Sequence, residues 1–169
     1  MRIILRDTNP EVVAGWLAEM GGHRSVSIGA GDLLRERLDA AVSPANSYGH
    51  MDGGIDKAYR ARFGLVIERR VREAIERRGG ELAVGEALIA PTGDGHIPRL
   101  VVAPTMRTPR ALADGEPVYL AMRAALECAQ QAVDPAIERL GAPGLGTGIG
   151  RLDPFVSAAA MRRAIDEVC

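Results

Sequence analysis

Residues 43–56 read SPANSYGHMDGGID, and the rest of the chain is organised around this stretch. The largely apolar run 38–42 before it predicts a short buried strand, and the apolar spacing over 55–78 predicts one long amphipathic helix after it. A loop that joins a strand to a helix can present backbone N–H groups to an anion. Gly53 and Gly54 would let a ligand approach the backbone closely, while Asn46 and Asp56 bracket the loop with polar side chains. An ordinary turn, in which Gly and Asn only shape the backbone, stays open as the alternative.

A second loop, residues 141–150, reads GAPGLGTGIG and has five glycines in ten residues. It also follows an expected strand and precedes an expected helix. Repeated glycines there predict an extended backbone wrapped around a ligand, with the candidate contacts Gly144, Gly146, Thr147, Gly148, Ile149 and Gly150. Two such loops together predict a diphosphate or a phosphorylated nucleotide at the carboxyl ends of the strands. The second loop is not a P-loop, because no Gly-Lys-Ser/Thr follows, and its glycine spacing differs from the GxGxxG fingerprint.

Composition limits the classes of protein to consider. Apolar residues make up 47% and charged residues 25% of 169 residues, which is typical of one globular domain covering residues 1–169. A net charge of −1 gives a nucleic-acid backbone binder no overall electrostatic support. Cys128 and Cys169 make no disulfide framework, and no Cys/His spacing indicates a metal site or a cofactor. No signal peptide and no long apolar run is present, so a cytoplasmic protein without a membrane partner is expected. The oligomeric state stays open, a monomer included.

Short apolar segments alternate with amphipathic ones along the chain. The expected strands cover residues 2–6, 25–28, 39–46, 86–90, 99–103 and 137–140, with hairpin-type turn residues between the fourth and the fifth. The expected helices cover residues 10–20, 55–78, 116–133 and 154–168, with a helical turn at 33–38. Asn9 and Asp153 each precede a proline and are expected N-caps. Six strands interleaved with helices predict a three-layer α/β/α domain.

Asp32 follows the second expected strand and precedes a short helical turn. Its carboxylate suits a helix N-cap, which is a common role for Asp. The alternative is a ligand-binding role, in which a carboxylate at the end of a strand accepts a hydrogen bond from the amino group of a base. The sequence leaves both interpretations open, although the physics of capping favours the first.

Three segments of the chain jointly resemble the macro domain family. GDL at 31–33, followed by DAAVSPAN at 39–46, is similar to the family's GDI followed by DAIVNAAN. GGID at 53–56 is similar to the end of the family's first glycine loop, and GLGTGIG at 144–150 is similar to its second, phosphate-wrapping loop. The order and the spacing agree, and the resemblance covers almost the whole chain.

This resemblance implies a mixed central sheet between helices and a pocket for ADP-ribose, either free or attached to a protein. By position, Asp32 would take the adenine amino group, with Leu33 beside it, and Asn46 would contact the distal ribose. The backbones of both glycine loops would bind the diphosphate, the first through Gly53, Gly54 and Ile55.

The resemblance also implies a reaction. In members that hydrolyse ADP-ribosyl esters, an Asp near the end of the first loop acts with the Asn, and Asp56 stands at that spacing, ten positions after Asn46. We therefore expect hydrolysis of ADP-ribosyl esters, of the mono-ADP-ribosyl hydrolase or O-acetyl-ADP-ribose deacetylase type, with Asn46 and Asp56 as catalytic residues. The dipole and free N–H groups of the following helix are expected to favour the ionised form of Asp56, which lets it accept a proton at neutral pH but lowers its basicity. Positioning of a water molecule therefore stays open beside base catalysis. The structural alternative is that Asp56 only caps that helix and has no catalytic role.

The chain departs from the family pattern at several positions. His50, Met51 and Asp52 stand where the family has a longer glycine run, and Asp52 adds negative charge near the proposed diphosphate. Ser43 and Pro44 replace the usual Asn-Ala. Two other functions therefore stay open beside hydrolysis: a non-catalytic module that binds ADP-ribose, and a phage-tail-like accessory protein with a changed nucleotide ligand.

Overall fold

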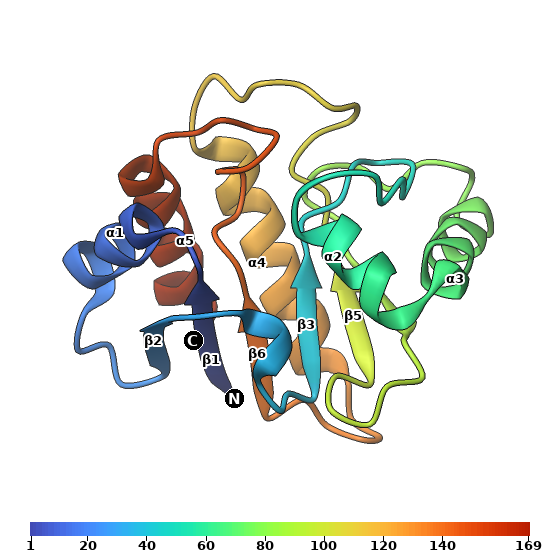
Figure 1. Ribbon diagram of the computed structural model, residues 1–169, viewed down its shortest axis with the longest axis horizontal. Coiled ribbons are helices and arrows are strands. Elements are labelled where there is room, and N and C mark those ends of the chain that lie inside the picture. Colours follow the sequence, from blue (N-terminus) through green and yellow to red (C-terminus); the bar gives the residue numbers. More distant parts are fainter.

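A computed structural model describes residues 1–169 and contains one six-stranded sheet with helices on both faces (Figure 1). The strands are β1 (Arg2–Asp7), β2 (Val26–Ala30), β3 (Ala40–Ser43), β4 (Leu88–Pro91), β5 (Arg99–Val102) and β6 (Arg139–Ala142). The helices are α1 (Pro10–Met20), α2 (Gly54–Phe63), α3 (Leu65–Glu76), α4 (Glu116–Gln131) and α5 (Pro154–Val168), with a 3₁₀ turn η1 (Leu33–Arg35).

The strands lie in the order β2-β1-β6-β3-β5-β4. All neighbouring pairs are parallel except β4 and β5, which form the antiparallel hairpin expected from the turn residues between them. The predicted mixed sheet of six strands is therefore confirmed. Because β1, β3 and β6 are parallel neighbours, the loops that follow them emerge at the same edge of the sheet.

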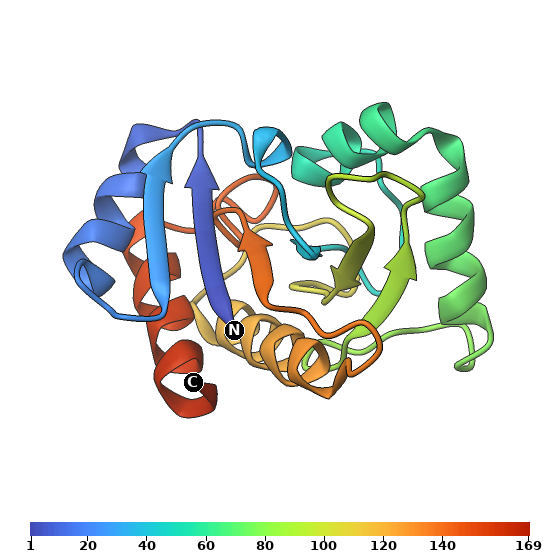
Figure 2. The same ribbon diagram turned by 90° about the horizontal axis from the view of Figure 1, so that it is seen from below.

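Alternating strand side chains divide the interior into two cores. In β1, Ile3 and Leu5 pack on one face with α1, α4 and α5, whereas Ile4 packs on the other face with α2 and α3. Trp16 lies fully buried in the first core and Tyr59 in the second. Figure 2 shows the sheet with α4 and α5 on one side and α2 and α3 on the other. This arrangement confirms the three-layer α/β/α architecture.

Two helix caps agree with the sequence. The Asn9 side chain accepts a hydrogen bond from the Glu11 N–H before α1, and that of Asp153 accepts from Phe155 and Val156 before α5. Both helices begin with proline, which has no N–H to leave unpaired. No helix in this structure combines the length and the hydrophobicity that a membrane span requires.

The single helix expected over 55–78 is wrong. Two helices, α2 and α3, meet at Gly64, whose φ of 82° and ψ of 172° lie in a region that is open almost only to glycine. The apolar spacing continues across this break, because both helices bury one face against the same side of the sheet, so periodicity alone did not reveal it. The strand expected over 39–46 is also shorter, since β3 ends at Ser43. Residues Pro44 to Asn46 therefore belong to the loop.

Candidate functional site

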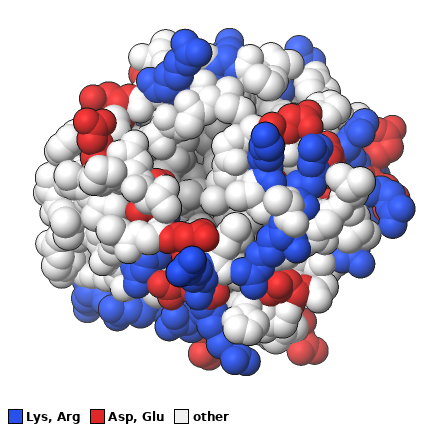
Figure 3. Space-filling model, in the orientation of Figure 1, with Lys and Arg blue, Asp and Glu red and all other residues white.

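A cavity of about 650 Å³ opens at the carboxyl ends of β1, β3 and β6. Both glycine loops line it, as do the ends of β1 and β2. In the space-filling view the face is hollowed near its centre, and charged side chains gather on the side where α2 and α3 lie and along the lower edge (Figure 3). The candidate catalytic and ligand-binding residues from the sequence all line this one cavity: Asp32, Leu33, Asn46, Gly53, Gly54, Ile55, Asp56, Gly144, Gly146, Thr147, Gly148, Ile149 and Gly150.

Asn46 organises the first loop with its own side chain. Its Oδ1 accepts hydrogen bonds from the backbone N–H groups of Tyr48 (3.1 Å) and His50 (3.3 Å), and its Nδ2 donates to the His50 carbonyl (2.9 Å). An amide group offers two acceptor positions and two donors, so one Nδ2 hydrogen remains for a ligand. Asn46 thus shapes the loop as well as lining the cavity.

Asp56 is buried at the first turn of α2, with 6% of its surface exposed. Its Oδ1 accepts a 2.5 Å hydrogen bond from the Ser43 hydroxyl. Burial raises the pKa of Asp56 to about 7, although the Ser43 hydrogen bond opposes the shift. The expected stabilisation of the ionised form by the helix terminus does not prevail, because removal of the carboxyl from water raises its pKa by a larger amount. The capping alternative is wrong as well, since no side chain caps α2.

Most glycines of the second loop have a packing role that the sequence did not reveal. A Cβ on Gly144 would lie 2.7 Å from Val12 Cγ1, and one on Gly146 would lie 2.7 Å from Val118 Cγ2. A Cβ on Gly150 would overlap the carbonyl oxygen of Gly146. Gly148 alone among these four has open space around it. The loop therefore needs its glycines chiefly to lie close against α1 and α4, and this packing holds the backbone at the cavity.

Asp32 caps a helical turn and also lines the cavity. Its Oδ1 accepts a 2.9 Å hydrogen bond from the Leu34 N–H at the start of η1, so the cap is confirmed. The residue is also exposed and lines the cavity, and Oδ2 accepts no hydrogen bond from the protein. Leu33, beside it, is 2% exposed and packs in the core that contains α2 and α3.

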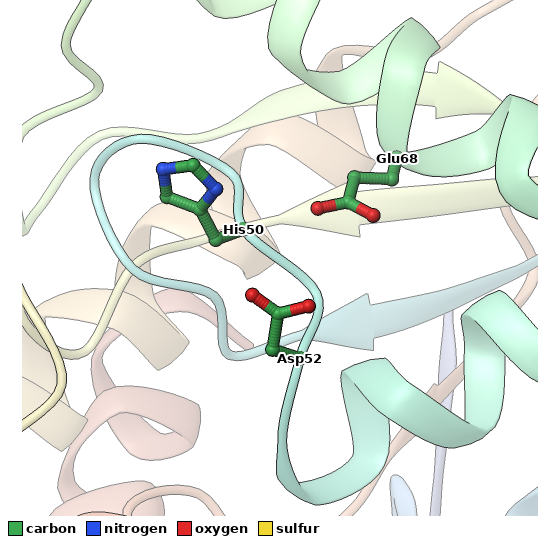
Figure 4. A group of neighbouring side chains, drawn as sticks. All are labelled: His50, Asp52 and Glu68. Atoms are coloured by element: carbon green, nitrogen blue, oxygen red, sulfur yellow. The ribbon is translucent and has the colours of Figure 1, made fainter.

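His50, Asp52 and Glu68 form a polar cluster that sequence spacing did not predict, since Glu68 comes from α3 (Figure 4). Their candidate metal-ligating atoms all lie within 4.8 Å of one another. The Arg60 guanidinium already supplies a cation, with Nη1 2.8 Å from both Asp52 Oδ1 and Glu68 Oε2. Asp52 is also largely exposed, so its charge is both paired and hydrated.

Other cavity residues were missed in the sequence. Asp7, at the end of β1, accepts a 3.0 Å hydrogen bond at Oδ2 from the Gly144 N–H and so ties the second loop to the sheet. Thr105, Met106 and Pro109 line the cavity from the loop after β5. A polar residue at the carboxyl end of a buried parallel strand is the signal that would have pointed to Asp7.

Comparison of the sequence with known proteins identifies relatives. The family model for the Macro domain matches residues 42–161. A protein of uncharacterised function from Aquifex aeolicus is 34% identical over 139 residues, which cover 80% of this chain and 78% of the relative. A second such protein, from Aeropyrum pernix, is 38% identical over 133 residues, which cover 78% of this chain and 65% of the relative.

Solved structures show the same fold. The macrodomain of Mycobacterium tuberculosis DarG has a TM-score of 0.69 at 24% identity, covering 82% of this chain and 88% of its own. A mutant macrodomain of Oceanobacillus iheyensis, solved with ADPR, has a TM-score of 0.68 at 21% identity, covering 81% and 74%. Thermosipho africanus DarTG in complex with ADP-ribose has a TM-score of 0.64 at 18% identity, covering 81% and 37%. With the family model matched over residues 42–161 and the fold shared with these structures, the chain belongs to the macro domain family.

Proposed function

We propose that this protein binds ADP-ribose in the cavity between the two glycine loops and hydrolyses an ADP-ribosyl ester there. The observation that carries the proposal is the place of Asp56. This buried carboxyl accepts a hydrogen bond from Ser43 and lines the same cavity as both glycine loops. A titratable group with a perturbed pKa in such a cavity is a candidate for acid–base chemistry.

Three observations support ADP-ribose as the ligand. The chain belongs to the macro domain family, similar macrodomains have been solved with ADPR or ADP, and Thermosipho africanus DarTG, part of which shares the fold, has been solved in complex with ADP-ribose. The cavity volume of about 650 Å³ suits a ligand of this size. The two loops also line the same cavity, where their backbone N–H groups could donate hydrogen bonds to a diphosphate.

The proposed ligand would extend along the cavity from Asp32 to Asn46. Asp32 Oδ2 would accept a hydrogen bond from the adenine amino group, while Oδ1 continues to cap η1. The backbones of Gly53–Ile55 and of the second loop would bind the diphosphate. The remaining Nδ2 hydrogen of Asn46 would donate to the distal ribose.

The proposed reaction uses water as the second substrate. The oxygen of water forms a bond to the carbon under attack, and the ester C–O bond breaks. In its ionised form Asp56 accepts a proton from this water through Oδ2, and then returns it to the leaving oxygen. A pKa of about 7 leaves the carboxyl able both to accept and to release this proton near neutral pH.

Two measurements on one sample test the proposal. Calorimetry with ADP-ribose reports binding, and release of ADP-ribose from a mono-ADP-ribosylated protein or O-acetyl-ADP-ribose reports turnover. We expect both from the parent protein and binding alone from Asp56→Asn. Binding without turnover in the parent, over a range of ester substrates, would replace the hydrolase with the binding module.

The binding module is the second candidate, and one observation favours it. Both acceptor positions of Asn46 and one of its donors are engaged within the loop, which leaves that side chain little capacity to contact a substrate.

A further inference from the structure

Ser43 and Asp56 stand on either side of the first glycine loop. Ser43 is the last residue of β3, with 1% of its surface exposed, and Asp56 lies in the first turn of α2. The 2.5 Å hydrogen bond from the Ser43 hydroxyl to Asp56 Oδ1 therefore joins the end of the strand directly to the start of the helix. The loop between them contributes Gly53 and Gly54 to the cavity.

Ser43 is the one hydrogen-bond partner that the Asp56 carboxyl has in the protein. Oδ2 accepts no hydrogen bond from the protein. Ser47 Oγ and Arg123 Nε are the fully buried side-chain polar atoms that lack a partner, so Oδ2 is not completely enclosed. Because Asp56 lines the cavity, this second oxygen is the part of the carboxyl that a ligand or a water molecule can reach.

No cation is paired with the Asp56 carboxylate, and its one hydrogen bond within the protein comes from Ser43. Tyr59, in the next turn of α2, is fully buried and donates its hydroxyl to the Val42 carbonyl at 3.0 Å. Burial raises the pKa of the Tyr59 hydroxyl, and the negative charges of Asp56 and then Asp32 raise it further. The Ser43 hydrogen bond is thus the contact that favours the ionised form of Asp56, against the effect of burial.

We propose that Ser43 is the positioning residue of this site, and that its hydroxyl holds Oδ1 of Asp56 so that Oδ2 faces the reacting group. This proposal rests on the proposed function of Asp56. A hydroxyl can donate to a carboxylate and accept from a carboxylic acid, so the contact persists when Asp56 gains or loses a proton.

Three substitutions of Ser43 separate hydrogen bonding from packing. Ser43→Ala removes the hydroxyl, Ser43→Cys keeps the volume with a weak donor, and Ser43→Thr keeps a hydroxyl. We expect kcat to fall about ten- to hundredfold in the Ala variant, the factor for losing a hydrogen bond to a charged group, with unchanged ADP-ribose affinity. The Cys variant should resemble Ala, and Thr should recover most of the loss. The pKa seen in the pH profile of kcat/KM should rise in the Ala and Cys variants.

A second readout does not depend on turnover. Titration of ¹³C-labelled aspartate by NMR, with Asp56→Asn to identify the signal, should give a higher pKa for Asp56 in Ser43→Ala than in the parent. An unchanged titration would overturn the proposal, whether or not the protein is an enzyme. Full activity of Ser43→Ala, together with an inactive Asp56→Asn, would also overturn it. A parent that binds ADP-ribose without turning over any ester would contradict the hydrolase instead, and the titration would still decide whether Ser43 controls this carboxyl.

Discussion

Gly53 of the first glycine loop and Ile149 of the second lie so close that a Cβ on Gly53 would overlap Cδ1 of Ile149. The two loops come from opposite parts of the sequence, and this pair brings them together over the cavity. Ile149 is 44% exposed, so its side chain can move aside without disturbing the core.

Gly53→Ala should therefore fold but bind ADP-ribose more weakly. The added methyl pushes Ile149 away and separates the loops, at a cost of about 1 kcal/mol or more in binding. Calorimetry measures the loss, and Gly95→Ala is the matched control because its Cβ would meet no atom within 4 Å. The double variant Gly53→Ala/Ile149→Ala should recover affinity relative to Gly53→Ala. A double variant that binds no better would show that this contact is not the cause.

Asp32→Asn should weaken ADP-ribose binding by roughly 1–3 kcal/mol, the range for a hydrogen bond to a charged group. The Asn oxygen can keep the cap on the Leu34 N–H, which places an amide NH₂ where Oδ2 would accept from adenine. Ribose-5-phosphate has no base and should bind equally well to the parent and the variant. Equal weakening of both ligands would leave Asp32 with the capping role alone.

Asp56→Asn should lower turnover on the order of 10²-fold while ADP-ribose still binds. For the parent, kcat/KM should rise with pH up to about 7 and then level off, because the proposed base must be ionised to accept a proton. Activity assays between pH 5 and pH 9 would measure this rise of kcat/KM with pH. A flat profile over this range would remove Asp56 from the role of base.

The stability of Asp56→Asn relative to the parent should increase with pH. The folded parent keeps Asp56 protonated up to about pH 7, whereas the unfolded chain loses that proton near 3.8, so the parent loses stability as pH rises between these values. Asn does not ionise and escapes this loss, which is at most about 4 kcal/mol at about 1.4 kcal/mol per pKa unit. Urea unfolding at pH 4.5 and pH 8 would measure the difference. The same difference at both pH values would contradict a raised pKa.

Arg60→Gln should weaken ADP-ribose binding, and more strongly at low ionic strength. Without this guanidinium, the negative charges of Asp52, which lines the cavity, and of Glu68 beside it lose their shared cation and repel a diphosphate. Arg69→Gln, on an exposed part of α3, removes the same charge and should change binding less. Adding Asp52→Asn to Arg60→Gln should restore part of the affinity. If Arg69→Gln lost as much ADP-ribose affinity as Arg60→Gln, the change in net charge would explain the effect, and the specific role of Arg60 would be contradicted.

The expected and observed elements agree best where local chemistry decides them. Asn9-Pro10 and Asp153-Pro154 mark two helix starts correctly, because a cap and its proline act within a few residues. The hairpin of β4 and β5 was also predicted from its turn residues. The break at Gly64 was missed, because a glycine inside an apolar pattern does not reveal that its backbone adopts a positive φ.

By itself, the sequence determined the three-layer α/β/α fold and the two glycine loops, since strand and helix periods and turn residues act locally. The tertiary structure alone decided what surrounds each side chain. Burial beside Ser43 sets the protonation of Asp56, and α3 brings Glu68 to Asp52 and Arg60. The close approach of the second glycine loop to α1 and α4 explains the glycines at 144 and 146. Each of these effects depends on the distance between residues far apart in the chain, and that distance exists only after the helices have packed on the sheet.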